Sequence, residues 1–323
     1  MTNSKGPLLS VVVPLYNERL GLPDFHKSLL ASLERSAKDS YEIIYCDDGS
    51  TDGSGHIIKD WALKDKHLKL LVLSKNFGKE VATTAGIHQA RGQAIITIDA
   101  DGQHPVELIG DFLDRWRAGS QVVIGLRTEN QNAGFAKHWG SKLFYRAFNR
   151  FSSLKLVPGS TDFRLIDRVV QADFIKMTEH NRITRGLIDW LGYKRDYIKF
   201  AANPRIAGEA SYSFKKLLKL AIDSTISLST SPLYITAYIG AVVLPLSALL
   251  GLGMVIDAGL GDPLNLHAKG SAYMVVLLLF LIGILLVSQG IIGLYLSHIH
   301  TEAQNRPLFI IDQSNSENLE DER

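Results

Sequence analysis

The sequence of 323 residues contains a single cysteine, Cys46. One cysteine excludes a disulfide framework and a structural zinc site built from thiolates. Neither sign of charge is in excess, because 35 Lys and Arg residues stand against 33 Asp and Glu residues. This balance argues against a nucleic-acid-binding protein with a broad basic surface and against an acidic, disordered chain.

Two common phosphate-binding motifs are also missing. No Gly-x-Gly-x-x-Gly follows an expected strand, and no Gly-x-x-x-x-Gly-Lys-Ser/Thr occurs. A dinucleotide-binding oxidoreductase and a P-loop nucleotidase therefore have no support. If this protein binds a diphosphate, a metal ion and cationic side chains must hold it.

Charged residues are almost absent from the stretch 224–297, which contains only three of them. Within it lie two uncharged runs, 233–256 and 272–297, and at about 1.5 Å of rise per helical residue each could cross a hydrocarbon core of about 30 Å. A buried hairpin of a soluble protein seldom sustains such runs without a polar face. Lysines precede the first run and Arg306 follows the second, which favours a cytoplasmic location for both ends. We therefore expect residues 232–300 to form two transmembrane helices in the inner (plasma) membrane, with both termini in the cytoplasm.

Two shorter segments flank this region. Residues 214–231 place apolar side chains at helical spacing with three lysines on the other faces, a pattern that predicts an amphipathic helix in the cytoplasmic headgroup layer. A surface helix packed on the soluble domain is the alternative. Residues 301–323 would form a cytoplasmic tail, whose polar and acidic end, Ser314–Arg323, we expect to be disordered.

Strand-like and helix-like stretches alternate through the first 127 residues. The apolar, β-branched runs that predict strands are Leu9–Leu15, Glu42–Cys46, Leu68–Leu73, Ala94–Ile98 and Gln121–Leu126. The amphipathic stretches that predict helices are Leu22–Ser36, Gly53–Leu63, Lys79–Arg91 and Pro105–Ala118. This alternation predicts an α/β domain over residues 1–213, with a mostly parallel, Rossmann-like sheet and flanking helices. In such sheets, ligands bind beyond the carboxyl ends of the strands.

Polar residues follow all five expected strands, in the segments 14–18, 47–52, 76–80, 99–103 and 125–127. Each segment has an ordinary structural explanation when taken alone. The run Asp47-Asp48-Gly49-Ser50 is compatible with a turn and a helix N-cap, and Glu18 and Glu80 with first-turn carboxylates. Five such ends at one edge of a sheet instead indicate a binding site.

Asp99 and Asp101 form the strongest single motif. Residues two apart in a strand point to the same side, and two carboxylates placed there repel each other unless a cation lies between them. Gln103 adds another oxygen at the same spacing. Oxygen ligands of this kind suit Mg²⁺ or Mn²⁺, which take further ligands from water and substrate phosphates.

The ordered set of segments Val13–Glu18, Asp47–Asp52, Asn76–Glu80 and Asp99–Gln103 resembles the inverting family-2 glycosyltransferases with a GT-A fold. Within them it is similar to the polyprenyl-phosphate glycosyltransferases, of the bactoprenol glucosyltransferase type and, more distantly, the dolichol-phosphate mannose synthase type. The resemblance spans most of residues 8–213, and the two apolar runs fit the bactoprenol type. It implies transfer of a hexose, glucose from UDP-glucose, to undecaprenyl phosphate at a membrane, and it leaves homo-oligomer formation open.

The resemblance also implies roles for individual residues. The nucleotide sugar would be bound at the strand ends by Pro14, Tyr16, Glu18, Asp47, Asp48, Lys79 and Asp99. The metal on the diphosphate would be held by Asp101 and Gln103, with Asp99 nearby, and Asp101 would be essential for catalysis. The lipid phosphate would be received by Arg127, by Lys137 with Ser141, and by Arg205.

Two positions depart from the family pattern. Lys137 stands where Arg is more usual, so it offers a point charge instead of a bidentate fork. Ala210 shifts the serine of the Arg-x-x-Gly-x-Ser segment by one position, which puts a role for Ser211 in doubt.

Four other functions remain open at this stage. A GDP-mannose-dependent polyprenyl- or dolichol-phosphate mannosyltransferase would share the same motifs. A UDP-sugar transferase acting on another lipid such as diacylglycerol, or on a protein, would attack with a hydroxyl group and need a general base, for which Asp162 or Asp189 could serve. A processive polysaccharide synthase would carry a Gln-x-x-Arg-Trp segment, which this sequence lacks. A non-catalytic nucleotide-sugar-binding membrane partner would not need Asp99, Asp101 and Gln103 intact.

Overall fold

The computed structural model of this chain describes residues 6–38, 40–128, 157, 159–180, 182–203, 249 and 270–319. Predictions that fall elsewhere lie outside the described residues. Among them are the amphipathic helix at 214–231 and all of the apolar run 233–256 except Leu249.

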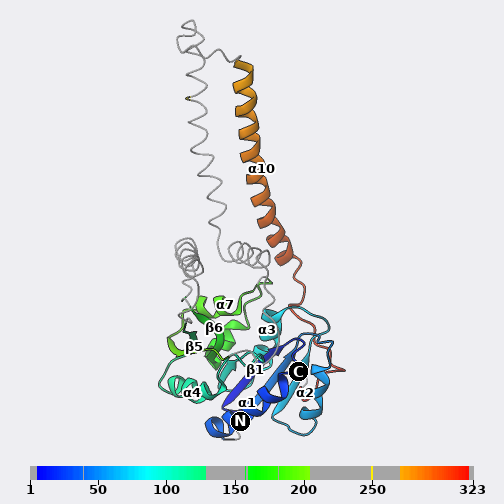
Figure 1. Ribbon diagram of the computed structural model, residues 1–323, viewed down its shortest axis with the longest axis vertical. Coiled ribbons are helices and arrows are strands. Elements are labelled where there is room, and N and C mark those ends of the chain that lie inside the picture. The colour runs from blue at the N-terminus through cyan, green and yellow to red at the C-terminus, as the bar shows by residue number, and fades with distance from the viewer. Residues whose placement is uncertain are drawn as a thin grey trace. The chain divides into compact units, whose positions relative to one another are not determined.

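The helices and strands alternate along most of the chain (Figure 1). In chain order they are β1 (Leu9–Leu15), α1 (Leu22–Ala37), β2 (Tyr41–Asp47), α2 (Ser54–Ala62), β3 (Leu68–Val72), α3 (Lys79–Gln89), β4 (Ala94–Thr97), the 3₁₀ turn η1 (Val106–Leu108), α4 (Ile109–Arg117), β5 (Val122–Arg127), β6 (Ser160–Asp167), α6 (Arg168–Phe174), α7 (Thr184–Trp190), β7 (Arg195–Phe200) and α10 (Gly270–Ala303). All strands and helices predicted in the first 127 residues are present, with ends that differ by a few residues.

The sheet contains seven strands in the order β3-β2-β1-β4-β6-β5-β7. Four of its strand pairs are parallel, as predicted, but β6 runs antiparallel to both β4 and β5. Neither β6 nor β7 was among the predicted strands, and β6 lies inside the sheet, between β4 and β5. Because β6 runs in the opposite direction, its first residues, Ser160–Asp162, lie at the edge where β1, β2 and β4 end.

Helices cover both faces of the sheet, and each face has its own core. Side chains of α1, α2 and α4 pack on one face, and side chains of α3, α6 and α7 pack on the other. Alternate residues of β1 serve the two cores: Val11 and Val13 face the first and Val12 faces the second. Gly86 lets α3 approach the sheet closely, since a Cβ atom there would collide with Val12 and Cys46.

The polar end of the tail is ordered, so the expectation that Ser314–Arg323 is disordered is wrong for its described part, which ends at Leu319. Residues 306–319, the C-terminal segment, run beside β3, the edge strand of the sheet, with antiparallel bridges between Leu73 and Ile311 and between Leu70 and Glu317. Composition misled the prediction because it does not report these contacts: backbone bonds join the segment to β3, and Asn318 Nδ2 donates to the carbonyls of Ala62 and Leu68 at 2.7 and 2.8 Å.

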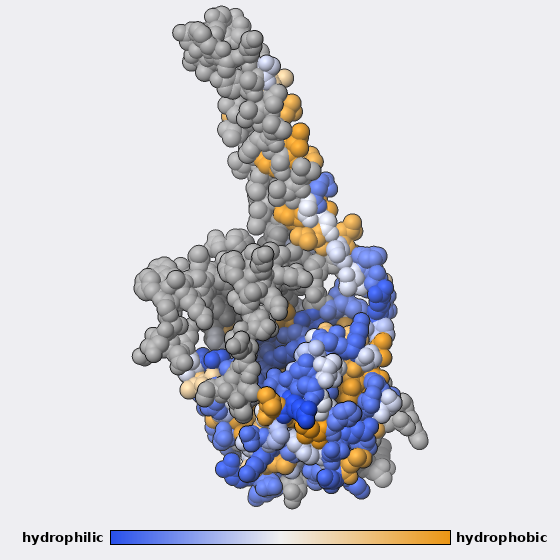
Figure 2. Space-filling view, turned by 45° about the vertical axis from the view of Figure 1, so that its right-hand side comes forward, coloured by the Kyte–Doolittle hydropathy of each residue, from blue (hydrophilic) through white to orange (hydrophobic). Residues whose placement is uncertain are grey.

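The chain divides into two compact units, one of residues 1–150, 154–214 and 306–323 and the other of residues 151–153 and 215–305. The first unit has a mainly hydrophilic surface in the view of Figure 2, whereas α10, in the second unit, exposes apolar side chains such as Leu278 and Leu285. The helix α10 covers the whole predicted run 272–297.

No helix in the part of the chain that the structure describes combines the length and the apolar character needed to span a membrane. The predicted transmembrane hairpin therefore has no support from the described residues.

Candidate active site

The loops that follow β1 and β2 are tied to each other. The amide N–H of Asn17 donates to Ser50 Oγ at 2.9 Å, and the side-chain oxygen of Asn17 accepts from the amide of Thr51 at 2.8 Å. The amide N–H of Glu18 donates to Ser54 Oγ at 3.2 Å. These contacts fix the first edge of the predicted nucleotide-sugar site. Of the residues predicted to line it there, Pro14 is buried within β1, whereas Tyr16 is 45% exposed.

Asp47 and Asp48 are buried under this edge, and backbone N–H groups already occupy their carboxylates. Asp47 accepts from the amide of Ser50 at 2.8 Å, and Asp48 accepts from the amides of Phe77 and Gly78 at 2.7 and 2.8 Å. Burial raises the pKa of both carboxyl groups, although these hydrogen bonds act in the opposite direction. The structure therefore shows Asp48 organising the loop after β3, which leads directly into Lys79.

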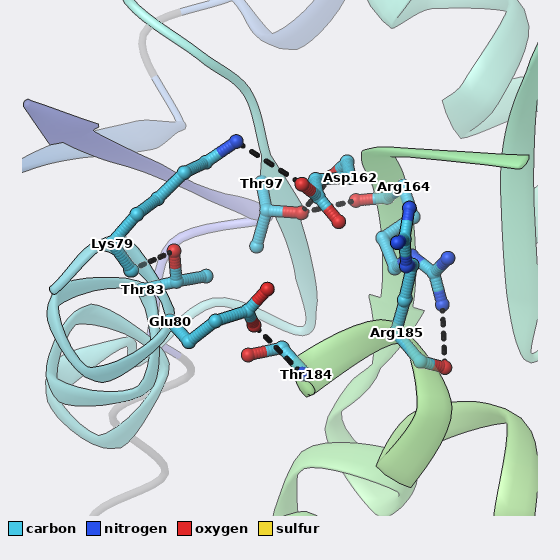
Figure 3. Close-up of a pocket in the computed structure, with 8 residues that line it drawn as sticks. All are labelled: Lys79, Glu80, Thr83, Thr97, Asp162, Arg164, Thr184 and Arg185. Atoms are coloured by element: carbon cyan, nitrogen blue, oxygen red, sulfur yellow. Dashed lines mark hydrogen bonds and ion pairs between the residues drawn. The ribbon is translucent and has the colours of Figure 1, made fainter. Parts of the chain in front are cut away.

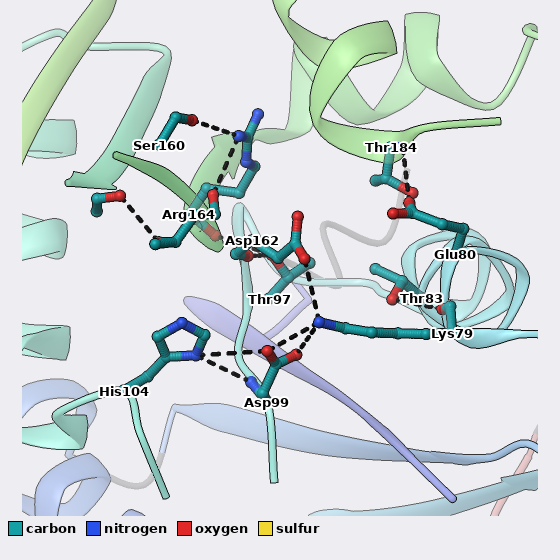
Figure 4. Close-up of polar contacts among 12 residues, drawn as sticks. Lys79, Glu80, Thr83, Thr97, Asp99, His104, Ser160, Asp162, Arg164 and Thr184 are labelled. Carbon is teal, nitrogen blue, oxygen red and sulfur yellow. Dashed lines mark hydrogen bonds and ion pairs between the residues drawn. The ribbon is translucent and has the colours of Figure 1, made fainter. Parts of the chain in front are cut away.

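Lys79 stands at the start of α3 and connects two carboxylates (Figure 4). Its ammonium lies 2.7 Å from an oxygen of Asp99, after β4, and 3.0 Å from Asp162 Oδ2, on β6. Burial alone would lower the pKa of Lys79, but the charges of Asp99 and Asp162 and their hydrogen bonds outweigh it and raise that pKa. Because 47% of the Lys79 side chain is exposed, solvent weakens these charge interactions.

The positive charges around Asp162 lower the pKa of its carboxyl group. Burial acts to raise the pKa of Asp162, but the positive charges of Lys79, Arg185 and Arg164 outweigh it and hold the pKa well below its usual range. Asp162 therefore remains an ionised, weakly basic carboxylate at neutral pH.

Asp99, Asp101 and Gln103 lie on a tight turn beyond β4. Gly102 adopts a φ of 73°, and the amide of Gln103 donates to Asp101 Oδ1 at 3.0 Å. The amide of Asp99 donates to His104 Nδ1 at 3.4 Å, and the His104 ring stacks on Phe163 with ring centres 5.3 Å apart. All three residues predicted to hold a metal ion thus lie on one turn, beyond the end of β4 at Thr97.

The donor chemistry of this turn fits a divalent cation only in part. Asp101 offers carboxylate oxygen and Gln103 offers amide oxygen, which suit Mg²⁺ or Mn²⁺. Asp99, in contrast, has the ammonium of Lys79 as its counter-charge. Among the described residues, no three His, Cys, Asp or Glu side chains are grouped in a way that could hold a metal ion. Asp101 and Gln103 could therefore hold an ion only with the help of substrate oxygens and water.

A small cavity of about 10 Å³ lies beside Lys79 and Asp162 (Figure 3). A volume of this size has room for about one water molecule. Its lining residues are Lys79, Glu80, Thr83, Thr97, Asp162, Arg164, Thr184 and Arg185. The amide of Thr184, at the start of α7, donates to Glu80 Oε2 at 2.8 Å and so connects α7 to the first turn of α3. Of these lining residues only Lys79 was a predicted site residue, and Asp162 was considered as a general base. The others, among them Arg164 on β6 and Thr184 and Arg185 on α7, were not predicted.

Arg164 supports this region from inside the protein. It is 1% exposed and lies 3.5 Å from Asp189, which is also within 3.6 Å of Arg195. The alternation of polar and apolar residues in Asp162-Phe163-Arg164 is the one sequence pattern that could have indicated a strand carrying Arg164. Asp189 is 6% exposed and paired with both arginines, so it has no access to a bound acceptor.

Of the residues predicted to receive the lipid phosphate, the structure describes only Arg127. It ends β5 and is exposed, and its amide donates to the carbonyl of Gly159 at 2.8 Å. Lys137, Ser141 and Arg205 lie outside the described residues, as does Ser211.

Residues 10–173 match the family model described as glycosyl transferase family 2. An uncharacterized glycosyltransferase of Synechocystis is 36% identical over 94% of this chain and 94% of its own length. A prophage-derived bactoprenol glucosyl transferase of Shigella flexneri is 34% identical over 96% of this chain and 99% of its own length. Among solved structures, a mannosyltransferase from Pyrobaculum calidifontis in complex with GDP-Man and Mn²⁺ superposes with a TM-score of 0.44 at 15% identity, over 88% of each chain. On the family match and these relatives, the chain belongs to glycosyl transferase family 2 and is an enzyme of the glycosyltransferase class.

Proposed function

We propose that this glycosyltransferase transfers a hexose, glucose from UDP-glucose, to the phosphate of undecaprenyl phosphate at the cytoplasmic face of a membrane. The product would be a polyprenyl-phosphate sugar with inverted anomeric configuration. One observation carries the proposal. Asp162, on β6, is bound to the ammonium of Lys79 at 3.0 Å, and the same ammonium contacts Asp99, the first residue of the turn 99–103.

This ion pair bears on the choice of acceptor. An alcohol acceptor must lose a proton as it attacks, so it needs a general base with a pKa near the working pH. The depressed pKa of Asp162 makes it a poor base, and Asp189 is buried between Arg164 and Arg195. A phosphate monoester is already anionic near pH 7, and its oxygen can attack the anomeric carbon without such a base. Neither Asp162 nor Asp189 is therefore suited to act as the general base that an alcohol acceptor needs. This favours a phosphate acceptor.

The donor side of the proposal rests on charge. A departing nucleoside diphosphate accumulates negative charge, and Lys79 supplies a fixed cation among the strand ends. Asp101 and Gln103 would hold Mg²⁺ or Mn²⁺ at the diphosphate; when bound, such an ion neutralises charge on the leaving group. Tyr16, which is 45% exposed at the end of β1, would contribute to the nucleotide pocket.

The acceptor and the location are supported by relatives and by the sequence. Relatives that align over almost their whole length carry the name bactoprenol glucosyl transferase. The uncharged runs 233–256 and 272–297 and the apolar side chains exposed on α10 agree with attachment to the plasma membrane, where a lipid acceptor would be found. We propose a cytoplasmic location for the catalytic unit from the lysines that precede the first run.

A panel of radiolabelled UDP- and GDP-sugars, each incubated with purified full-length protein and undecaprenyl phosphate, tests the proposal. We expect label from UDP-glucose in solvent-extractable lipid, dependent on Mg²⁺ or Mn²⁺ and abolished by excess EDTA. Lipid-linked label from GDP-mannose and from no other donor would contradict UDP-glucose as the donor. It would still agree with undecaprenyl phosphate as the acceptor. No lipid-linked label from any donor would contradict the proposed reaction.

A further inference from the structure

The C-terminal segment, residues 306–319, completes the outer edge of the sheet. Strand β3 pairs with β2 on one side, and an edge strand normally leaves its other row of N–H and C=O groups unpaired. Here the amide of Glu317 donates to the carbonyl of Leu70 at 2.9 Å, and the amide of Leu70 donates to the carbonyl of Glu317 at 3.1 Å. The segment therefore covers part of this edge through two separate antiparallel bridges to β3, with a turn at 313–315 between them.

Two further bonds extend this pairing toward the active site. The amide of Asp312 donates to the carbonyl of Val72 at 2.8 Å, and the amide of Ser74 donates to the carbonyl of Ile310 at 2.9 Å. The amide of Val72 donates to Ser316 Oγ at 3.0 Å. These bonds hold the chain up to Ser74, where the loop that leads to Lys79 begins.

Apolar side chains of the same segment pack on the core next to α3. Phe309, Ile311 and Leu319 contact the core that contains Leu71, Leu73 and residues of α3. The Phe309 ring meets the ring of His88, on α3, edge-on at 5.6 Å. Ile310, the neighbour of Ile311, points away and is 54% exposed. The segment therefore contacts both β3 and α3, the two elements that flank the loop 74–78.

That loop is part of the candidate active site. Its amides at Phe77 and Gly78 bind the carboxylate of Asp48, and Lys79 follows directly and binds Asp99 and Asp162. A Cβ atom on Gly49 would lie only 3.0 Å from the backbone of Lys75, so the loop also packs tightly on the turn after β2. A shift of β3 or α3 by a fraction of an ångström would move these groups.

From these contacts we propose that the C-terminal segment is a positioning element of the nucleotide-sugar site: it fixes the loop 74–78 and thereby the ammonium of Lys79 and the carboxylate of Asp48. The inference rests on the proposed function in so far as the site binds a nucleotide sugar. The proposed effect of the segment on the site is transmitted through β3 and α3. The catalytic unit is then incomplete without the residues that follow α10 in the sequence.

The two adjacent isoleucines provide a matched test in the full-length protein. Ile311→Asn places a polar group against the core, whereas Ile310→Asn makes the same change at an exposed position and keeps every backbone bond. Hydrogen exchange followed by mass spectrometry reports the loop, and calorimetric titration with UDP and Mg²⁺ reports the site. In Ile311→Asn we expect at least tenfold faster exchange over residues 74–79 and about fivefold weaker UDP binding. Ile310→Asn should match the wild type in both, and β1 and β4 should exchange at wild-type rates in both variants.

Wild-type exchange over residues 74–79 in Ile311→Asn, or equally faster exchange throughout the sheet, would overturn the inference. If Ile311→Asn does not fold, Ser316→Ala takes its place, because it removes the acceptor of the Val72 amide together with a hydroxyl bond to the carbonyl of Asp312. Ser314→Ala is its control, because it removes a hydroxyl bond to Asp312 at an exposed position without touching β3. The exchange measurement needs no substrate. If the wild type binds no UDP, the proposed function fails, and the exchange result still decides whether the segment positions the loop.

Discussion

The ammonium of Lys79 lies 2.7 Å from the carboxylate of Asp99, so the first acid of the Asp-x-Asp pair is bound to a cation that the chain itself supplies. The pair links the start of α3 to the end of β4, and Asp162 on β6 joins it at 3.0 Å. The ammonium of Lys79 thus connects the start of α3, the end of β4 and β6, which are distant from one another in the sequence. This contact explains how two acids can lie close together at a strand end without a large electrostatic penalty.

Replacing Lys79 should therefore disturb the site more than the loss of one surface lysine would. In Lys79→Met, the carboxylates of Asp99 and Asp162 lose their shared cation and repel each other, so both should move from their present positions. Because misplacement by about 1 Å can reduce a rate by about a hundredfold, we expect glucosyl transfer to fall by about 10- to 100-fold. Initial rates with saturating donor measure the effect.

Lys79→Arg is the control for charge, since it keeps a cation that can contact both acids. It should retain more activity than Lys79→Met. Equal rates in wild type and Lys79→Met would show that the contact with Asp99 has no part in the reaction.

Asp48 should matter for the loop after β3 because it accepts two amide N–H groups while only 2% exposed. Asp48→Asn keeps the shape but offers one acceptor oxygen, which leaves a buried N–H group without a partner. Such a loss costs about 1–3 kcal/mol. We expect a decrease of this size in the free energy of unfolding, measured by urea denaturation followed by tryptophan fluorescence. Asp60→Asn, at an exposed position of α2, should change stability by less than about 0.5 kcal/mol.

The depressed pKa of Asp162 predicts how stability depends on pH. A carboxyl group whose pKa is lower in the folded than in the unfolded protein stabilises the fold above the unfolded pKa of about 3.9, and this contribution is lost as pH falls through the folded pKa. The stability difference between wild type and Asp162→Asn should therefore be constant above about pH 5 and shrink below about pH 4.

Urea unfolding of both proteins at several pH values between 3 and 7 tests this prediction. Asp111→Asn, on the exposed side of α4, serves as the reference for a carboxylate without such partners. A stability difference between wild type and Asp162→Asn that grows as the pH falls would contradict the ion pair with Lys79.

Much of this fold could be predicted from the sequence because the signals were local. The strand from Leu9 to Leu15 and the helix from Lys79 coincide with stretches predicted from the sequence, and the polar residues predicted to follow the strands do so. Asp99 and Asp101 were expected on one side of a strand, but β4 ends at Thr97 and they lie on the turn that follows it.

The rest depended on contacts between residues distant in sequence. Nothing near Asp162 in the sequence indicates that β6 inserts between β4 and β5 and brings this acid to Lys79, 83 positions away. The end of the tail, Ser314–Arg323, was predicted to be disordered from its composition, but its described part, to Leu319, is held by backbone and side-chain bonds to β3 and its neighbours, which composition does not report. The roles predicted for Lys137, Ser141 and Arg205 stay predictions.

The central claim is that the acceptor is a lipid phosphate, and one comparison tests it most directly. Purified wild-type protein is incubated with radiolabelled UDP-glucose, Mg²⁺ and either undecaprenyl phosphate or undecaprenol, which differ only in the phosphate. Asp101→Ala is assayed in parallel as the inactive control, with its folding checked by circular dichroism. We predict lipid-linked label with undecaprenyl phosphate alone and none with Asp101→Ala. Equal labelling of undecaprenol, or near-normal transfer by folded Asp101→Ala, would contradict the account.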